Sequence, residues 1–253
     1  MAALHEAFVR PRVARLVGGL RERGRRGAKA LAEAILPASM VVWRGPEGRS
    51  RIRSLGRAVG SNGADAAGPG RIALTFDDGP TSLTPQYLEV LEQLGARATF
   101  FLVGQACEAR PELVQAIAAR GHELAGHGYT HRRFTELSEQ DLSQELARTR
   151  SLLPPSAQNP TLVRPPFGAV SLGSLLTCSR GGFTTVLWSL NSGDWRSRNA
   201  VEVEETFTAG TASAGEIVLL HEGQTWTMEA LPSIVGSLRK AGHELVTVGE
   251  LLA

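Results

Sequence analysis

Short apolar runs alternate with amphipathic helical patterns from residue 71 to the C-terminus. The apolar runs predict strands at residues 71–76, 98–103, 122–126, 161–164, 184–188, 216–220 and 244–247. The segments with helical spacing predict helices at residues 84–94, 111–120, 138–153, 171–181, 199–209, 226–241 and 248–252. Strands that alternate with helices favour a parallel sheet. Closing this sheet on itself predicts an α/β fold, a distorted (β/α)7 barrel with one unit fewer than the usual eight.

The first 70 residues do not follow this pattern. Residues 12–36 place apolar side chains at helical spacing between arginines, which predicts an amphipathic helix. Residues 60–70 consist mostly of Gly, Ala and polar residues, which is typical of a flexible linker. We therefore expect a basic, partly helical N-terminal extension over residues 1–58, a flexible linker over 59–70 and a folded domain over 71–253.

The charge is distributed unevenly between these parts. Residues 1–58 contain 13 Lys and Arg against 4 Asp and Glu, whereas the remainder contains 14 against 21. A basic amphipathic helix can lie on an anionic membrane surface, so we carry peripheral membrane contact through residues 1–58 as a hypothesis. The alternatives are a solvated arm or a helix packed on the domain. No nucleic acid partner is expected.

The sequence also bears on location and on redox chemistry. No stretch approaches the ~20 apolar residues that a spanning helix needs. The N-terminus does not have the pattern of a standard signal peptide, which favours a cytoplasmic or peripheral membrane location. The two cysteines, Cys107 and Cys178, do not make a disulfide framework or a thiolate metal site.

Polar residues follow five of the expected strands at the point where each strand ends. In chain order they are Asp77 and Asp78, His127 and His131, residues 164–168, residues 191–195, and His221. Because the carboxyl ends of parallel barrel strands share one rim, we expect these groups to meet there. Scattered structural residues would not be expected to converge in this way.

One carboxylate and two imidazoles make a metal-ligand set that leaves a coordination position for water, as catalytic zinc sites do. The other of the two adjacent carboxylates is then free to act as a base on that water. His127 and His131 are four residues apart, which would place them on one face of a helical turn. By itself, the Asp-Asp-Gly-Pro run of residues 77–80 is also compatible with a plain turn.

Over residues 71–253 the chain resembles the polysaccharide deacetylase family, also called carbohydrate esterase family four. Five sequence blocks of that family occur in order: Thr-Phe-Asp-Asp-Gly at 75–79, His-Gly-Tyr-Thr-His at 127–131, Arg-Pro-Pro-Phe-Gly at 164–168, Asn-Ser-Gly-Asp-Trp at 191–195, and Val-Leu-Leu-His at 218–221. Two positions depart from the family pattern. Gly128 replaces a hydroxyl residue, for which Thr130 is a candidate substitute, and Asn191 replaces an aspartate. The loss of that charge would shift the pKa of His221 or alter a sugar contact.

The resemblance implies a role for each residue of these blocks. Asp77 would be the general base and His221 the general acid, with Arg164 orienting the base and Asp194 the acid. The metal, Zn²⁺ or another divalent transition metal such as Co²⁺, would be held by Asp78, His127 and His131. The backbone near Phe167 would stabilise the oxyanion. Trp195 and Leu219 would form an apolar wall around the acetyl methyl group, or simply pack in the core.

These roles predict a metal-dependent hydrolase that removes N-acetyl groups from a GlcNAc-containing polysaccharide or oligosaccharide and releases acetate. One alternative is the same chemistry on an O-acetylated glycan. Another is a formylated or acetylated lipid-linked sugar at a membrane surface, for which the basic extension gives a reason. A third is a non-catalytic carbohydrate-binding protein, which the loss of Asp77, a metal ligand or His221 would indicate; all of these residues are present.

Overall fold

The computed structural model describes residues 41–42, 70–154, 161–207 and 212–253 of the 253-residue chain. The helix expected at residues 12–36 lies outside the described residues, as does the expected linker up to residue 69. In the described part of the chain, no helix is both long enough and apolar enough to span a bilayer.

One parallel sheet forms the centre of the described part. Its nine strands are β1 (Val41–Val42), β2 (Gly70–Gly79), β3 (Thr99–Leu102), β4 (Glu123–Gly126), β5 (Leu162–Val163), β6 (Thr184–Val186), β7 (Leu190–Asn191), β8 (Ile217–His221) and β9 (His243–Val246). The strand order is β1-β6-β5-β4-β3-β2-β8-β7, and β9 also pairs with β2. All seven strands expected from the apolar runs are present. The two additional strands, β1 and β7, have only two residues each, too few to produce a recognisable pattern.

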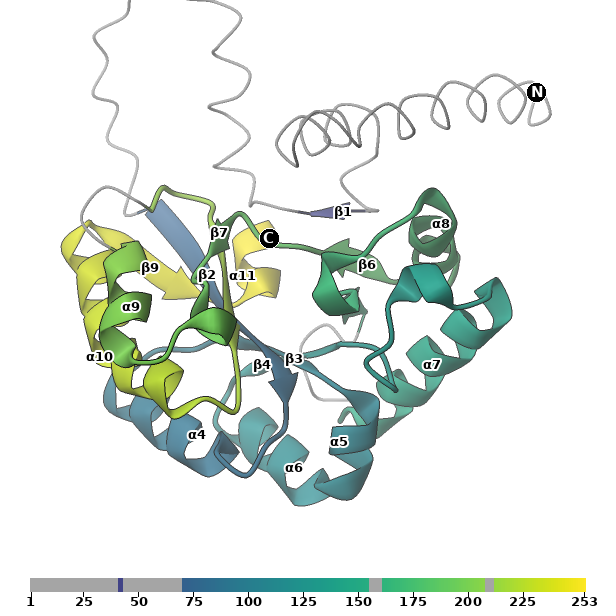
Figure 1. Cartoon of the computed structure of the whole chain (residues 1–253), viewed down its shortest axis with the longest axis horizontal. Helices are drawn as coiled ribbons and strands as arrows, with labels where there is room; N and C mark the ends of the chain where they lie inside the picture. The colour runs from purple at the N-terminus through teal and green to yellow at the C-terminus, as the bar shows by residue number, and fades with distance from the viewer. Residues whose placement is uncertain (1–40, 43–69, 155–160, 208–211) are drawn as a thin grey trace, which may run out of the picture.

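In the view of Figure 1, helices flank the sheet on the left, below and on the right. They are α4 (Thr84–Gln93), α5 (Gly104–Ala109), α6 (Pro111–Ala119), α7 (Glu139–Leu152), α8 (Leu172–Arg180), α9 (Ala200–Glu204), α10 (Thr225–Lys240) and α11 (Val248–Leu252). Seven of these correspond to the expected helices, and α5 was not predicted. Three-residue 3-10 helices lie at Phe134–Glu136, Pro166–Gly168, Asp194–Arg196 and Glu205–Phe207. The last of these continues α9 over most of the span expected for that helix.

Two apolar layers hold the sheet in place. On the outer face, Leu91 of α4, Ile117 of α6 and Leu231 of α10 belong to one buried cluster with strand residues. On the inner face, Phe101 and the α11 residue Val248 belong to a second cluster. This double coverage is the reason that the strands are apolar almost throughout rather than alternating. The expected α/β fold is confirmed as a curved parallel sheet with helices, consistent with a (β/α)7 barrel.

Strand β1 comes from the segment assigned to the N-terminal extension. Val41 pairs with Thr185 and Val42 with Val186, and both valines are buried. The division of the chain at residues 58 and 70 stays a prediction. The structure adds that two residues before this division lie in the sheet of the domain.

The register of the sheet brings distant residues together at one rim. Strands β2 and β8 are neighbours, and Asp77 is the register partner of His221. The hydroxyl of Thr75 donates to the carbonyl oxygen of Val218 at 2.6 Å, which ties the two strands together below the rim. Parallel pairing therefore places an acid from the start of the domain beside an imidazole from its end.

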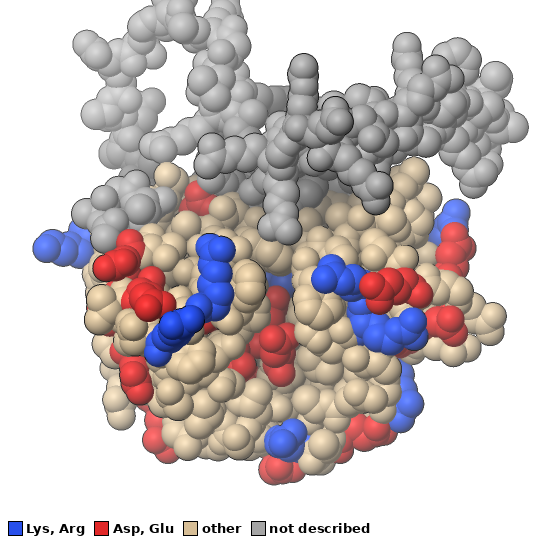
Figure 2. Space-filling model, in the orientation of Figure 1, with Lys and Arg blue, Asp and Glu red and all other residues tan. Residues whose placement is uncertain are grey.

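Acidic and basic side chains are scattered over the described part of the face in Figure 2. They form no continuous basic patch on the described part of this face.

Candidate active site

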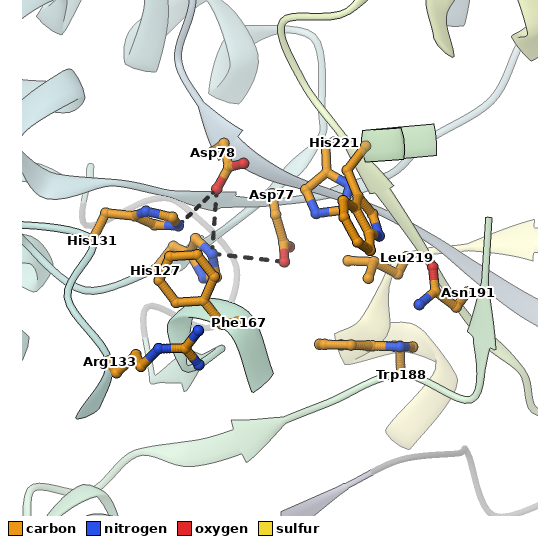
Figure 3. A pocket seen from close by; sticks show the side chains of 11 residues that line it. Asp77, Asp78, His127, His131, Arg133, Phe167, Trp188, Asn191, Leu219 and His221 are labelled. Atoms are coloured by element: carbon orange, nitrogen blue, oxygen red, sulfur yellow. Dashed lines mark ion pairs between the residues drawn. The ribbon is translucent and has the colours of Figure 1, made fainter. Parts of the chain in front are cut away.

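A pocket of about 440 Å³ opens at the carboxyl ends of the strands (Figure 3). Eight of the ten predicted site residues line it: Asp77, Asp78, His127, His131, Phe167, Trp195, Leu219 and His221. The other two are fully buried and contact lining residues: Arg164 contacts Asp77, and Asp194 contacts His221. Sequence reasoning thus selected residues that the fold assembles in one place.

Asp78, His127 and His131 form a cluster that suits a metal ion. The ligand atoms of the three side chains lie within 4.8 Å of one another. Oδ1 of Asp78 is 3.5 Å from Nε2 of His127 and 3.0 Å from Nε2 of His131. Burial, the largest effect, would raise the pKa of Asp78, but its hydrogen bonds with the two histidines outweigh burial and lower the pKa. The cluster therefore offers an ionised carboxylate beside two imidazoles.

The tautomer of His127 also fits metal binding. Nδ1 of His127 lies 2.7 Å from the carbonyl oxygen of Arg164. A carbonyl oxygen can only accept a hydrogen bond, so Nδ1 carries the proton and Nε2 keeps its lone pair. Nε2 is the atom that faces Asp78 (Figure 3). A backbone carbonyl that orients a ligating histidine in this way is a common feature of metal sites.

The prediction that a helical turn brings the two histidines together is wrong. They lie in a loop that follows β4, with Gly128 at φ +74° and His131 at φ +58°. A Cβ at position 128 would lie only 3.2 Å from the ring of Phe134. A residue with a side chain would also have to adopt the left-handed backbone conformation, which glycine tolerates best. The space and the backbone at this position therefore favour glycine over a residue with a hydroxyl side chain.

Asp77 is held by a buried arginine. Nη1 of Arg164 donates to Oδ1 of Asp77 at 2.7 Å and to the Thr75 hydroxyl at 2.7 Å, while Nη2 donates to the carbonyl oxygen of Leu187 at 3.1 Å. Burial lowers the pKa of Arg164, and the neighbouring charge of Asp77 opposes this effect. Oδ2 of Asp77 lies 3.7 Å from Nε2 of His127. One oxygen of Asp77 thus anchors the side chain, and the other lies beside the ligand cluster.

His221 is held by Asp194, and in Figure 3 it lies on the other side of Asp77 from His127 and His131. Oδ1 of Asp194 is 2.7 Å from Nδ1 of His221, and Oδ2 accepts the backbone N–H of His221 at 2.7 Å and the Thr227 hydroxyl at 3.0 Å. Burial, the largest effect, would lower the pKa of His221, but the hydrogen bond and negative charge of Asp194, with the charges of Asp77 and Asp78, raise it overall. The imidazole is therefore biased toward its protonated form.

Aromatic rings form the outer walls of the pocket. Phe167 and Trp195 are more than half exposed, although both are large and apolar, whereas Leu219, which also lines the pocket, is buried. Trp188 and Arg133 also line the pocket and were not predicted. Trp188 closes the expected strand at 184–188, and Arg133 lies two residues after His131. Their places in the sequence, at the end of a strand and close to His131, are the only signals that could have indicated Trp188 and Arg133 as pocket residues.

The sequence analysis also missed Glu222, a buried carboxyl group directly after His221. Its Oε1 accepts the backbone N–H of Thr81 at 3.1 Å and contacts the hydroxyl of Thr84. Burial raises its pKa. Glu222 links the end of β8 to the turn that follows Asp78, so it shares in shaping the rim.

The fold and the pocket together define an α/β protein whose site, at the carboxyl ends of parallel strands, has the residue types of a metal-dependent hydrolase. A family model described as polysaccharide deacetylase matches residues 64–186. A peptidoglycan-N-acetylglucosamine deacetylase of Bacillus cereus is 36% identical over 187 residues, which cover 72% of this chain and 87% of that protein. The chain belongs to the polysaccharide deacetylase family, and the prediction of a polysaccharide deacetylase is confirmed.

Other relatives extend the comparison. A chitooligosaccharide deacetylase of Bradyrhizobium sp. is 31% identical over 77% of this chain and 96% of that protein. A deacetylase of peptidoglycan N-acetylglucosamine from Listeria monocytogenes is 36% identical, but the match spans only 38% of its length. Among solved structures, a family 4 carbohydrate esterase from Streptomyces lividans in complex with acetate has a TM-score of 0.66 and 32% identity, covering 70% of this chain and 92% of that one.

Proposed function

We propose that this chain removes N-acetyl groups from a GlcNAc-containing glycan in a metal-dependent hydrolysis that releases acetate. The observation that carries the proposal is the placement of Asp77 and His221 around the Asp78, His127 and His131 cluster in a single pocket. We assign Zn²⁺ to this cluster because one carboxylate with two imidazoles suits it, and Co²⁺ or another divalent transition metal would suit it too. When bound, such an ion would polarise the acetyl carbonyl and make a water molecule more acidic.

The protein residues then supply the proton transfers. Asp77 takes a proton from the attacking water through the oxygen that is not bound to Arg164. The oxygen of water adds to the acetyl carbon, and the backbone N–H of Phe167 is our candidate for a donor to the resulting oxyanion. His221 donates a proton to the amide nitrogen as the carbon–nitrogen bond breaks. Asp194 fixes Nδ1 of His221 and leaves Nε2 for that donation. The products are a free amine and acetate.

The walls of the pocket support a sugar substrate. Trp195 and Phe167 expose their rings at the mouth of the pocket, where flat apolar surfaces can pack against a sugar face. Leu219 lines the pocket and is buried, so its apolar side chain suits the acetyl methyl group. The matched relatives are named for peptidoglycan and chitooligosaccharide deacetylation, so both glycans are candidates for this chain.

A panel of acetylated glycans separates these candidates. Acetate release would be measured in parallel on chitooligosaccharides, peptidoglycan fragments and acetylxylan, with the metal-loaded protein. We expect release from at least one of the two N-acetylated substrates. Release from acetylxylan alone would favour the O-acetyl alternative.

Substitution of the base tests the assigned roles. Asp77→Asn should lower kcat by about 10²–10⁴-fold, the range ascribed to a general base, and the protein should still bind one zinc ion per chain. Metal content after dialysis and acetate release are the two measurements. Glu112→Gln, an exposed carboxylate on α6, is the matched control and should match the wild type. Undiminished turnover in Asp77→Asn would remove Asp77 as the base.

Peripheral membrane contact through residues 1–58 stays a hypothesis that rests on their excess of basic residues. A truncation would also remove Val41 and Val42, which form β1, so charge neutralisation is the cleaner test. Replacing Arg10, Arg12 and Arg15 by Gln should reduce cosedimentation with vesicles that contain anionic lipid. No binding by the wild-type chain would end the idea.

A further inference from the structure

The loop from His127 to His131 carries two of the three proposed metal ligands in an irregular backbone. Gly128 and His131 both have positive φ, and for a histidine this conformation is unfavourable. In addition, position 128 offers no side chain to stabilise the loop. Contacts with residues outside the loop must therefore stabilise its backbone conformation.

The loop is held from one side by Glu145, a half-buried residue of α7. Oε2 of Glu145 accepts the backbone N–H of Tyr129 at 2.9 Å and that of Thr130 at 3.1 Å. Oε1 accepts the hydroxyl of Thr130 at 2.5 Å. A single carboxylate thus satisfies three donors from two consecutive residues that lie between the histidines.

Helix α5 holds the opposite side of the loop. The backbone N–H of Gly104 donates to the carbonyl oxygen of Gly128 at 2.9 Å, and that of Gln105 donates to the carbonyl oxygen of Tyr129 at 3.0 Å. The carbonyl groups of the loop therefore point to α5, and its N–H groups point to Glu145. With both edges bonded, the backbone between the histidines has little freedom to change its shape.

The Tyr129 side chain joins the same two helices. Its hydroxyl donates to Glu108 of α5 at 2.5 Å, and the guanidinium of Arg148 on α7 lies 3.9 Å from the centre of its ring. Arg148 also binds Glu108 at 3.1 Å. Helices α5 and α7 are thereby connected across the loop, so the carboxylate of Glu145 is presented from a fixed position.

We propose that Glu145 is a positioning residue that braces the His127–His131 loop and so sets the distance between His131 and Asp78. The proposal rests on the metal site of the proposed function. Glu145 acts through hydrogen-bond geometry, together with the Thr130 hydroxyl, and takes the place of a side-chain brace at position 128. Glu145 is not one of the residues that line the pocket, and its hydrogen bonds go to Tyr129 and Thr130, between the two proposed ligands.

Truncation of the side chain should weaken the metal site. In Glu145→Ala two backbone N–H groups lose their acceptor, and His131 is no longer held in its left-handed conformation. Partners that orient metal ligands typically contribute about 10–100-fold to metal affinity, so we expect a loss of Zn²⁺ affinity in this range. Competition between the full-length protein and a chromophoric zinc chelator measures it.

The conservative variant distinguishes a brace from a charge effect. In Glu145→Gln, the amide oxygen can accept both backbone N–H groups, and the amide nitrogen can donate to the Thr130 hydroxyl. We therefore expect Glu145→Gln to keep Zn²⁺ affinity within roughly threefold of wild type, since all three contacts can be made. If Glu145→Gln loses as much Zn²⁺ affinity as Glu145→Ala, the carboxylate acts by its charge, and the proposed brace is overturned.

Glu139→Ala is the matched control, because Glu139 is an exposed carboxylate on the same helix whose ion pair with Arg180 is 3.7 Å long. It should leave Zn²⁺ affinity unchanged.

Thr130→Val removes only the hydroxyl contact and should cause a smaller loss of Zn²⁺ affinity than Glu145→Ala. The variant that combines Thr130→Val with Glu145→Ala should lose no more Zn²⁺ affinity than Glu145→Ala alone. If Glu145→Ala does not fold, the Zn²⁺ affinities of Thr130→Val and Glu145→Gln are compared with that of the wild type. A loss in Thr130→Val that Glu145→Gln does not show supports the brace, and a large loss in Glu145→Gln contradicts it. Wild-type affinity in a folded Glu145→Ala protein would overturn the proposal.

A second measurement separates failure of this proposal from failure of the proposed function. Hydrogen exchange of the Tyr129 and Thr130 amides in metal-free protein reports the brace directly. Faster exchange is expected in Glu145→Ala and not in Glu139→Ala, and equal exchange would contradict the brace. If the wild-type chain binds no zinc but this exchange pattern holds, the proposed metal function is wrong and the structural role of Glu145 stands.

Discussion

At the scale of single residues, Asp77 and Asp78 illustrate how adjacent carboxylates receive different tasks. In a regular strand, successive side chains point to opposite faces. Here the pairing of β2 with β3 shifts register between Asp77 and Gly79, and Asp78 has φ +74°. Both side chains therefore line one pocket, with Asp77 bonded to Arg164 and Asp78 beside the histidines. The irregular end of the strand is what separates the proposed base from the proposed ligand.

The pair of His221 and Asp194 leads to a prediction about pH. Asp194 raises the pKa of His221, and the proposed acid is active when protonated, so activity should fall as pH rises through this pKa. Asp194→Asn removes the negative charge and should lower the pKa of His221. The alkaline limb of the kcat/KM profile should therefore move to lower pH.

The measurement is the pH dependence of acetate release, with an NMR titration of the His221 ring as an independent readout. Glu202→Gln, an exposed carboxylate on α9, serves as the control and should leave the limb in place. An alkaline limb that does not move in Asp194→Asn would show that His221 is not the group that titrates there.

At the scale of elements, strand β1 shows how a short segment can matter for a fold. Val42 is 3% exposed and belongs to the inner apolar cluster with Phe101 and Val186. Val41 packs with Leu175 and Leu187 in a separate cluster. These contacts cover the edge of β6 with a segment that lies far from it in the sequence.

A charge at this position should therefore destabilise the whole domain. Val42→Asp would place a carboxylate without a partner in an apolar cluster, which should lower the free energy of unfolding by about 3 kcal/mol or more. Val201→Asp is the matched control, since Val201 is 61% exposed and should tolerate the change. Urea denaturation of both variants measures the difference. Equal stability would mean that β1 contributes little to the domain.

At the scale of the whole molecule, Arg164 shows how the barrel interior supports the site. Its side chain has no solvent exposure, and its guanidinium lies 3.9 Å from the centre of the Phe101 ring. It donates to groups on β2 and, at 3.3 Å, to the carbonyl oxygen of Val186 at the end of β6. One buried cation thus connects separate strands of the sheet and orients Asp77. Such a group is favourable only because all of its hydrogen-bond partners are already in place.

Much of this arrangement could be predicted from the sequence. The apolar runs that became β2 to β6, β8 and β9 carry enough residues for their pattern to be recognised, and their polar ends identified the residues of the pocket. Two-residue strands and the six-residue helix α5 are too short to leave such a pattern, and their formation depends on neighbours. Trp188 and Arg133 carry no chemical signature of their own.

The sequence by itself determined which kinds of side chain would meet at the rim, because strand periodicity and parallel pairing follow from local composition. Only the tertiary structure decided how they meet. The left-handed conformations of Asp78, Gly128 and His131, and the three donors that converge on Glu145, depend on contacts between segments distant along the chain. Local preference disfavours such conformations in non-glycine residues, so they persist only where surrounding packing and hydrogen bonds impose them.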